Sequence, residues 1–276
     1  MRTALIQLSS GDDPVANLDS VLGYMDRAHA EGARFMLTPE VTNCVSTSRA
    51  RQKEVLQSEA EDITLKGLSQ RAGELGVWLL IGSLALKTDD PDGRFANRSF
   101  LIGPDGTVRA RYDKIHMFDV EVTPEETYRE SAGFRPGTRA VLAETDFAKV
   151  GMTVCYDIRF PALYQALAQA GATVMTVPAA FSPVTGAAHW HSLLRARAIE
   201  TGCFVLAPAQ CGEHPATEGK TRRTYGHSLA VSPWGEVLID GGTAPGFHIL
   251  DLDATLVDEA RRKVPSLSHV RKFDGP

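Results

Sequence analysis

The 276-residue chain has the composition of an ordinary globular protein, with 43% hydrophobic and 23% charged residues. Its net charge of −5 argues against a surface for binding nucleic acid. No apolar run approaches the roughly 20 residues that a membrane span needs. The four cysteines form no CxxC pair and nothing marks secretion, so we expect reduced thiols in a cytoplasmic protein.

No linker or low-complexity run divides the chain, and we expect a single domain over residues 1–276 with a polar tail from about residue 265. In the first half, apolar periodicity and turn signals indicate strands that alternate with helices. The predicted strands are 3–8, 34–37, 77–84, 96–102 and 108–114, and the predicted helices are 14–30 and about 65–75.

A long segment, residues 116–137, follows the last of these strands and is too rich in charge, proline and glycine to be core. We expect a loop there, and loops of this length are uncommon unless they have a function. It contains Glu121, Glu125, Glu126 and Glu130. We expect three of these four acids, all but Glu130, to lie on the solvated surface.

The second half opens with a βαβ unit between Lys149 and Pro178. Its helix has Pro161 in the first turn and Gly171 as its stop. A loop over 179–187, a helix over 189–202 and a charged loop over 212–223 follow, and a final helix has Asp253 as its cap. The remaining predicted strands are 203–208, 225–231, 236–239 and 247–251. The two similar halves suit two sheets packed face to face with helices outside.

Cys155 lies where βαβ units place reactive groups, at the carboxyl end of a strand and before a helix. The positive end of the helix dipole favours the thiolate form of a cysteine there. The alternative is that Cys155 is only a small core residue, as free cysteines often are.

Glu40 and Lys114 also lie just past predicted strands, so all three groups are expected at one edge of a sheet. Glu40 has the alternative of a solvated loop residue or helix cap. Together they can form a nucleophile, a base and an oxyanion stabiliser, with the backbone N–H of Tyr156 as a second donor. The chemistry would be attack of sulfur on an amide or nitrile carbon, followed by hydrolysis of a thioester by water that Glu40 activates.

Four segments in this order resemble the carbon–nitrogen hydrolase (nitrilase) superfamily, whose catalytic triad is Glu–Lys–Cys. They are LTPEVTN around Glu40, RYDKIHMFDV around Lys114, YRESAGFRPG around Glu130 and VCYDIRFP around Cys155. The resemblance covers essentially the whole chain. It implies an α/β fold, a four-layer αββα sandwich of two mixed β-sheets with helices on the outer faces. It also implies that Glu130 is a second glutamate that positions Lys114 and the reacting group of the substrate.

Within the superfamily, CYDIRFP, AHW, LLRARAIET and YGHS look most like the amidases that act on deaminated glutathione. The resemblance therefore implies an amidase for a small carboxylate-bearing amide. The alternatives are an ω-amidase acting on α-ketoglutaramate-type substrates, an N-carbamoyl amino acid hydrolase, and a non-catalytic binding member of the fold. The four intact residues argue against the last. The segment HWHSLLRARAIETG resembles the one through which members pair, which implies a homodimer or a higher homo-oligomer.

Two further residues are candidates for substrate binding. Arg159, four residues past Cys155, can bind a carboxylate through two hydrogen bonds, unless it pairs with Asp157 or another acid. Phe181, in the loop after the next strand, can form a wall of the pocket or serve as a core aromatic.

No metal or organic cofactor is expected. His189 and His191 are two residues apart, so on a helix they point to different faces, and no third ligand lies at ligand spacing. Asn97-Arg98-Ser99 matches a glycosylation sequon but falls in a predicted strand.

Overall fold

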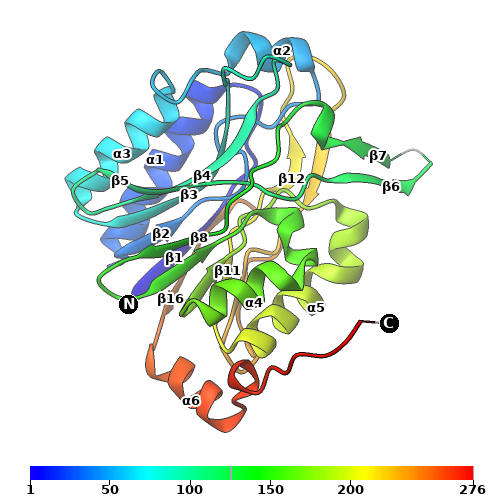
Figure 1. Cartoon of the computed structure of the whole chain (residues 1–276). Coiled ribbons are helices and arrows are strands. Elements are labelled where there is room, and N and C mark those ends of the chain that lie inside the picture. Colours follow the sequence, from blue (N-terminus) through cyan, green and yellow to red (C-terminus); the bar gives the residue numbers. More distant parts are fainter. Residues whose placement is uncertain (125, 276) are drawn as a thin grey trace.

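The computed structural model describes residues 1–124 and 126–275. Two six-stranded mixed sheets pack face to face, and helices cover their outer faces (Figure 1). The predicted αββα sandwich is therefore confirmed. None of the helices among the described residues is long and apolar enough to cross a membrane. Glu125, which we expected on the solvated surface, lies outside the described residues.

The first sheet is built mainly from the first half of the chain and has the order β16-β1-β2-β3-β4-β5. Its strands are β1 (Arg2–Gln7), β2 (Phe35–Leu37), β3 (Trp78–Leu86), β4 (Ala96–Ile102), β5 (Val108–Asp113) and β16 (Gly246–Asp251). The pairs β1–β2 and β2–β3 are parallel, and the three outer pairs are antiparallel. Because β5 runs antiparallel to β4, it points in the same direction as β2 and ends at the same edge of the sheet.

The second sheet repeats this plan with the order β15-β14-β11-β10-β9-β8. Its strands are β8 (Val141–Glu144), β9 (Lys149–Met152), β10 (Val174–Thr176), β11 (Phe204–Ala207), β14 (Leu229–Val231) and β15 (Val237–Asp240). The central strands β9, β10 and β11 are parallel, and the flanking pairs are antiparallel. Each sheet thus has a parallel centre, whose carboxyl ends are the usual place for a site in an α/β fold.

Helices α1 (Pro14–Ala30) and α3 (Ile63–Leu75) cover the first sheet, and α4 (Pro161–Gln169) and α5 (Pro183–Thr201) cover the second (Figure 1). The two remaining α-helices among the described residues are α2 (Arg49–Val55) and α6 (Thr255–Lys263). The bounds of α1 match the prediction, because the Asp13 side chain accepts hydrogen bonds from two first-turn N–H groups. Helix α5 begins six residues before its predicted start, with Pro183 in its first turn.

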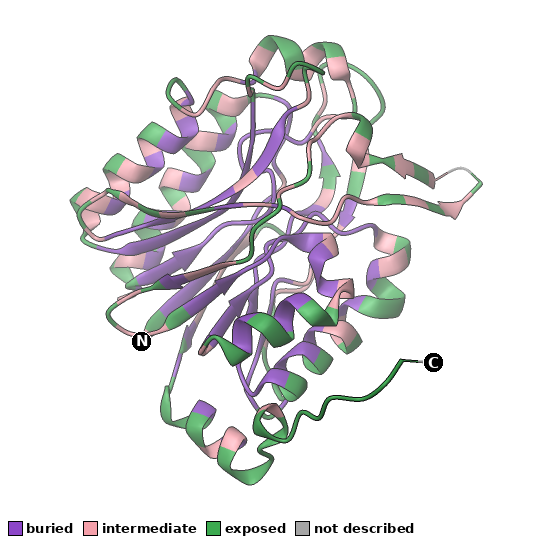
Figure 2. Cartoon of the chain, viewed as in Figure 1, coloured by how far each residue is buried: buried purple, intermediate pink, exposed green. Residues whose placement is uncertain are grey.

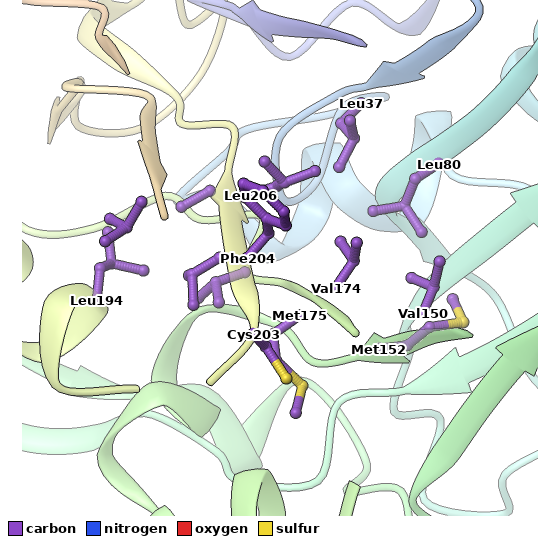
Figure 3. Close-up of a cluster of buried hydrophobic side chains, with 14 of the residues drawn as sticks. Leu37, Leu80, Val150, Met152, Val174, Met175, Leu194, Cys203, Phe204 and Leu206 are labelled. Atoms are coloured by element: carbon purple, nitrogen blue, oxygen red, sulfur yellow. The ribbon is translucent and has the colours of Figure 1, made fainter. Parts of the chain in front are cut away.

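The main core lies between the two sheets and beneath α4 and α5. Figure 3 shows Leu37 and Leu80 of the first sheet gathered with Val174 and Phe204 of the second. Fully burying such a side chain stabilises the fold by roughly 1.5–3 kcal/mol. The central strands of both sheets are accordingly buried, whereas β15 at one edge is largely exposed. The helices are exposed on their outer sides (Figure 2).

Several irregular segments differ from the prediction. The expected loop over 116–137 contains the hairpin β6 (Asp119–Thr123) and β7 (Glu126–Arg129) and a short 3-10 helix, Glu130–Ala132. The charged loop over 212–223 is flanked by a second hairpin, β12 (Cys211–His214) and β13 (Arg222–Tyr225). Short, polar, half-exposed strands carry little apolar periodicity, and β8, with the sequence VLAE, is too short at four residues to show any. The first hairpin projects from the body of the molecule (Figure 1).

Candidate active site

Three of the predicted residues meet because their strands end close together. Glu40 lies three residues past β2, Lys114 directly follows β5, and Cys155 lies three residues past β9 in the facing sheet. All three line a single cavity of about 500 Å³, together with Glu130. The interpretation of Glu40 as a solvated loop residue is therefore wrong, whereas Cys155 belongs to the core and also lines the cavity.

The centre of the site is a buried cation held between two carboxylates. The ammonium nitrogen Nζ of Lys114 lies 2.9 Å from Oε1 of Glu40. It also lies 2.9 Å from Oε1 and 2.8 Å from Oε2 of Glu130. The Lys114 side chain is only 2% exposed, so these carboxylates supply its stabilisation in place of water.

Asn97 of β4 links the two glutamates. Its Nδ2 donates to Oε1 of Glu40 at 2.9 Å and to Oε1 of Glu130 at 3.3 Å. Its own Oδ1 is buried and has no hydrogen-bond partner among the described residues. The sequence offered only a glycosylation sequon at this position, and a buried amide in a strand cannot serve as one. No local signal marks Asn97, because its partners are 57 and 33 residues away.

Electrostatic interactions keep both Glu40 and Lys114 ionised. Burial opposes ionisation of Glu40, but the charge and hydrogen bond of Lys114 and the charge of Arg222 outweigh it and hold the pKa of Glu40 below its usual value. Burial likewise opposes the charge on Lys114, but Glu130 and then Glu40 outweigh it and raise the pKa of Lys114. The ammonium is thus charged at any physiological pH.

Cys155 has a strained backbone and a buried thiol. Its φ of 49° is in the left-handed region, which is unusual for a residue other than glycine and is often found at functional sites. The N–H of Cys155 donates to the carbonyl of Pro178 at 2.9 Å, which fixes this turn on the end of β10. The side chain lies in hydrogen-bonding contact with Glu40.

The resting thiol is protonated, contrary to the expectation of a thiolate at a helix N-terminus. Burial and the charge of Glu40 raise the pKa of Cys155 well above its usual value, and Lys114 offsets this only in part. A 3-10 turn, Cys155–Arg159, also separates the sulfur from the start of α4 at Pro161. A protonated thiol needs a base before it can act as a nucleophile, and the carboxylate of Glu40 is the acidic group in contact with it.

The 3-10 turn is held by Asp157, which is fully buried. Its Oδ2 accepts hydrogen bonds from the N–H of Val154 at 2.8 Å and from the hydroxyl of Tyr112 at 2.7 Å. Its Oδ1 accepts one from the N–H of His116 at 3.0 Å. Asp157 therefore positions the turn that carries Cys155, and it is not the partner of Arg159.

Arg159 is not among the residues that line the cavity, and its role in substrate binding stays a prediction. Its guanidinium contacts the ring nitrogen Nδ1 of His189 at 3.3 Å and lies over the rings of Tyr156 and Phe181. Those two aromatic residues do line the cavity. Phe181 also packs against Trp190, so it is both a pocket wall and a core aromatic.

Three other arginines line the cavity, Arg49, Arg129 and Arg222, and sequence reasoning missed all of them. Arg222 donates through one terminal nitrogen to the carbonyl of Ala180 at 2.7 Å, while its Nε is buried without a partner among the described residues. Arg49 donates to the carbonyl of Gly93 at 3.0 Å, and its other terminal nitrogen is likewise buried and unpaired in the described chain. Buried, unpaired guanidinium donors are costly unless a ligand satisfies them.

Glu126 does not lie fully on the solvated surface, where the sequence predicted it. It is half-buried rather than solvated, and its Oε1 accepts hydrogen bonds from the hydroxyl groups of Tyr128, at 2.8 Å, and Ser182. Tyr128 and Ser182 line the cavity, so the hairpin β6–β7 contributes to its wall. Glu121 is exposed, as expected.

Comparisons with known proteins agree with this geometry. The carbon–nitrogen hydrolase family model matches residues 2–262. A deaminated glutathione amidase of Yersinia enterocolitica is 38% identical over 269 residues, which are 97% of this chain and 92% of that protein. One of Mus musculus is 38% identical over 272 residues, 97% of this chain and 82% of that protein.

The fold has a similarly good match. The crystal structure of the NitFhit protein of Caenorhabditis elegans superimposes with a TM-score of 0.90 at 32% identity, covering 98% of this chain and 65% of that longer one. A buried thiol beside a carboxylate and an ammonium, in a chain that the family model matches almost from end to end, leaves one assignment. The chain belongs to the carbon–nitrogen hydrolase family of the nitrilase superfamily and is a hydrolase acting on amides.

Proposed function

We propose that this enzyme hydrolyses the amide bond of deaminated glutathione through a thioester on Cys155. The observation that carries the proposal is the buried Glu40–Lys114–Cys155 cluster in a cavity that also presents two unpaired arginine donors. The Yersinia and mouse relatives, both deaminated glutathione amidases, support the choice of substrate.

In the first half-reaction, the sulfur of Cys155 attacks the amide carbon as its proton passes to Glu40. The carbonyl oxygen becomes an oxyanion, stabilised by an N–H of Lys114 and the backbone N–H of Tyr156. Lys114 can turn one N–H toward this oxyanion, because both carboxylate oxygens of Glu130 contact the ammonium and hold it in place. When the intermediate collapses, the carbon–nitrogen bond breaks and the departing amine takes the proton from Glu40. A thioester and a free amine result.

In the second half-reaction, Glu40 removes a proton from water, and the hydroxyl attacks the thioester carbon. The same donors stabilise the second oxyanion. The carbon–sulfur bond then breaks, the thiol regains a proton through Glu40, and the carboxylic acid leaves. The lowered pKa of Glu40 keeps it ionised and ready for both proton transfers. Glu130 and Asn97 act as positioning residues, because both contact Glu40 or Lys114 directly.

The two arginines suit a substrate with two carboxylates. Deaminated glutathione carries one carboxylate beside its 2-oxo group and a second at its glycine end. Arg222 is close enough to Glu40 to lower its pKa, so we assign it the carboxylate nearer the reacting carbon. Arg49, which lines the cavity beside Gly133, is assigned the glycine end. Guanidinium groups bind carboxylates through paired, charge-assisted hydrogen bonds.

The second candidate is ω-amidase activity on α-ketoglutaramate. This smaller substrate has a single carboxylate and would use Arg222 but not Arg49. The two candidates therefore differ in one measurable way, namely whether Arg49 contributes to turnover.

The experiment is a turnover screen of deaminated glutathione, α-ketoglutaramate, an N-carbamoyl amino acid and a simple nitrile. We expect the highest kcat/KM with deaminated glutathione. Arg49→Gln should lower kcat/KM for that substrate by roughly 10- to 100-fold and leave α-ketoglutaramate unaffected, whereas Arg222→Gln should lower both. Arg223→Gln is the matched control, since Arg223 neighbours Arg222 but is exposed. Preference for α-ketoglutaramate with no effect of Arg49→Gln would favour the ω-amidase instead.

We also propose a homodimer that pairs through α5. Its exposed face carries Ala188, Ser192 and Ala196 at intervals of four residues, followed by Ile199, which is 55% exposed. Small side chains let a second helix approach closely. Light scattering should give a dimer, and Ala196→Arg should shift it to a monomer. The four buried, unpaired cysteines support a cytoplasmic location, which cell fractionation would test.

A further inference from the structure

Away from the cavity, three metal-ligating side chains meet on the surface where α5 passes β14 and β15. They are His191 of α5, His227, two residues before β14, and Asp240, the last residue of β15. We call them the surface cluster. One ring nitrogen of each histidine and a carboxylate oxygen of Asp240 all lie within 4.8 Å of one another.

We propose that the surface cluster is a binding site for a divalent transition-metal ion of the Zn²⁺ class. Two imidazoles and one carboxylate form a donor set that Zn²⁺ commonly accepts, and three protein ligands leave a position for water. The side chains of His191, His227 and Asp240 are 36%, 23% and 37% exposed, so an ion can reach them from solvent.

The structure already holds two of the three ligands in place. The N–H of His227 donates to the carbonyl of Gly242 at 2.6 Å, and its own carbonyl accepts from Nε1 of the buried Trp190 at 2.8 Å. Its φ of 55° is in the left-handed region, so these contacts stabilise a backbone conformation that few residues adopt. The ring of His227 stacks on that of Tyr225 at a centroid distance of 4.4 Å. Such support is what orients the ligands of metal sites.

Asp240 is oriented in the same way. Its Oδ1 accepts the N–H of Gly242 at 2.9 Å. Without an ion, Oδ1 also lies 2.7 Å from Nδ1 of His227, and Oδ2 lies 2.9 Å from Nε2 of His191. Each ring thus points one nitrogen at the carboxylate. Metal binding requires these two nitrogens to carry no proton, so that their lone pairs and the carboxylate face one ion.

Sequence reasoning considered only His189 and His191 as a metal pair and rejected it, because residues two apart point to different faces of a helix. His189 and His191 do lie on different sides of α5, and His189 contacts Arg159 instead. The true partners of His191 are far along the chain, with Asp240 separated from it by 49 residues. Only the packing of α5 on the second sheet brings them together.

The experiment measures binding of Zn²⁺ and Co²⁺ to the Cys155→Ala protein, because the nucleophilic thiol is a competing soft ligand. Calorimetry should show one site per chain, and the Co²⁺ absorption spectrum should report nitrogen and oxygen ligands without a thiolate charge-transfer band. His191→Gln, His227→Gln and Asp240→Asn should each weaken binding by roughly 100-fold or more. His189→Gln, on the same helix, should leave it unchanged.

A second measurement distinguishes loss of the metal site from loss of the fold, which His227→Gln can also cause. Zn²⁺ should raise the Tm of the Cys155→Ala protein, and His191→Gln, which alters only a half-exposed helix position, should abolish that rise. Binding that survives all three substitutions, or no binding at millimolar Zn²⁺, would overturn the proposal. Since none of these measurements depends on turnover, the outcome is separate from that of the proposed amidase function.

Discussion

Two clusters of ionisable groups in this molecule use similar chemistry in opposite environments. The buried cluster consists of Glu40, Lys114, Glu130 and Cys155, and the surface cluster places a carboxylate between His191 and His227. The side chains of Lys114 and Glu40 are 2% and 5% exposed, whereas those of the surface cluster are 23–37% exposed. The difference shows how burial determines what a set of charges can do.

Burial fixes the protonation states of the groups in the buried cluster. With little water to compete, each charge depends on its neighbours, so the ammonium stays charged and the thiol stays protonated until a substrate arrives. In the surface cluster, water screens the interactions and the rings can exchange protons or ligands. The first arrangement suits catalysis, and the second suits reversible binding.

The largest expected effect comes from removing the nucleophile of the buried cluster. Cys155→Ala should lower kcat by roughly 10⁴-fold or more, because no thioester can form. The fold should be retained, as circular dichroism and Tm would show. Cys211→Ala removes another buried thiol that lies outside the cavity and should retain activity. Substantial turnover by Cys155→Ala would rule out the thioester route.

Replacing Lys114 tests how strongly the charges of the buried cluster depend on one another. Lys114→Met should destabilise the protein by roughly 3–5 kcal/mol at pH 8, since it removes the ammonium that both Glu40 and Glu130 contact. In the variant the folded-state pKa of these carboxyls should rise above the unfolded value. The penalty should therefore be present above that raised pKa and shrink as the pH falls through it. Urea unfolding at pH 8 and pH 5 measures both values.

The control for that series is Lys149→Met, which removes an exposed ion pair with Glu144. It should change stability by less than about 1 kcal/mol at either pH. An equal loss at pH 8 and pH 5 for Lys114→Met would contradict the buried-charge explanation.

The buried His214 should have an effect on stability between those of Lys114 and Asp240. His214 is held neutral, with Nδ1 donating to the carbonyl of Ser10 and Nε2 accepting from the hydroxyl of Thr224, both at 2.8 Å. Burial and the charge of Arg222 lower the pKa of His214 to about 4. Because the unfolded chain takes up this proton near its ordinary pKa of about 6.5, stability should fall as the pH drops from 6.5 to 4, by about 3 kcal/mol. Urea titrations at several pH values measure this slope, and His214→Gln should flatten it.

The smallest effect is expected at the surface cluster. Its two histidines help to lower the pKa of Asp240 against the opposing effect of burial. A lowered folded-state pKa adds stability above the unfolded value, and that stability is lost as the pH falls through the folded value. Asp240→Asn should thus cost less than about 1 kcal/mol at pH 7 in metal-free buffer, and nothing at low pH. A cost of several kcal/mol would show that this site is as tightly coupled as the buried one.

Local patterns identified the parts of the molecule that are governed by local physics. The bounds of α1 follow from a cap and a periodic apolar face, and β4 follows from its flanking turns. Glu40, Lys114 and Cys155 were proposed because strand ends can be read from hydrophobic runs. We expected all three at one edge of a sheet, but Cys155 follows β9 of the facing sheet.

The residues that were missed depend on contacts across long stretches of chain. Arg222 was assigned to a charged loop, and nothing nearby indicates that its guanidinium lines the cavity. Arg159 was expected to face the substrate because of its nearness to Cys155, yet the 3-10 turn aims it at His189. Nearness in sequence sets distance along the backbone but not the direction of a long side chain.

The sequence by itself thus predicted the layers of the sandwich and most of its strands, and it singled out Glu40, Lys114 and Cys155 as candidate reacting groups. Tertiary structure alone decided the protonation of Cys155, the choice of arginines in the cavity and the meeting of His191 with Asp240. The physical reason is the distance along the chain over which the relevant interactions act. Helix and strand formation depend on neighbours a few residues apart, whereas burial and charge at a site depend on atoms brought together by packing.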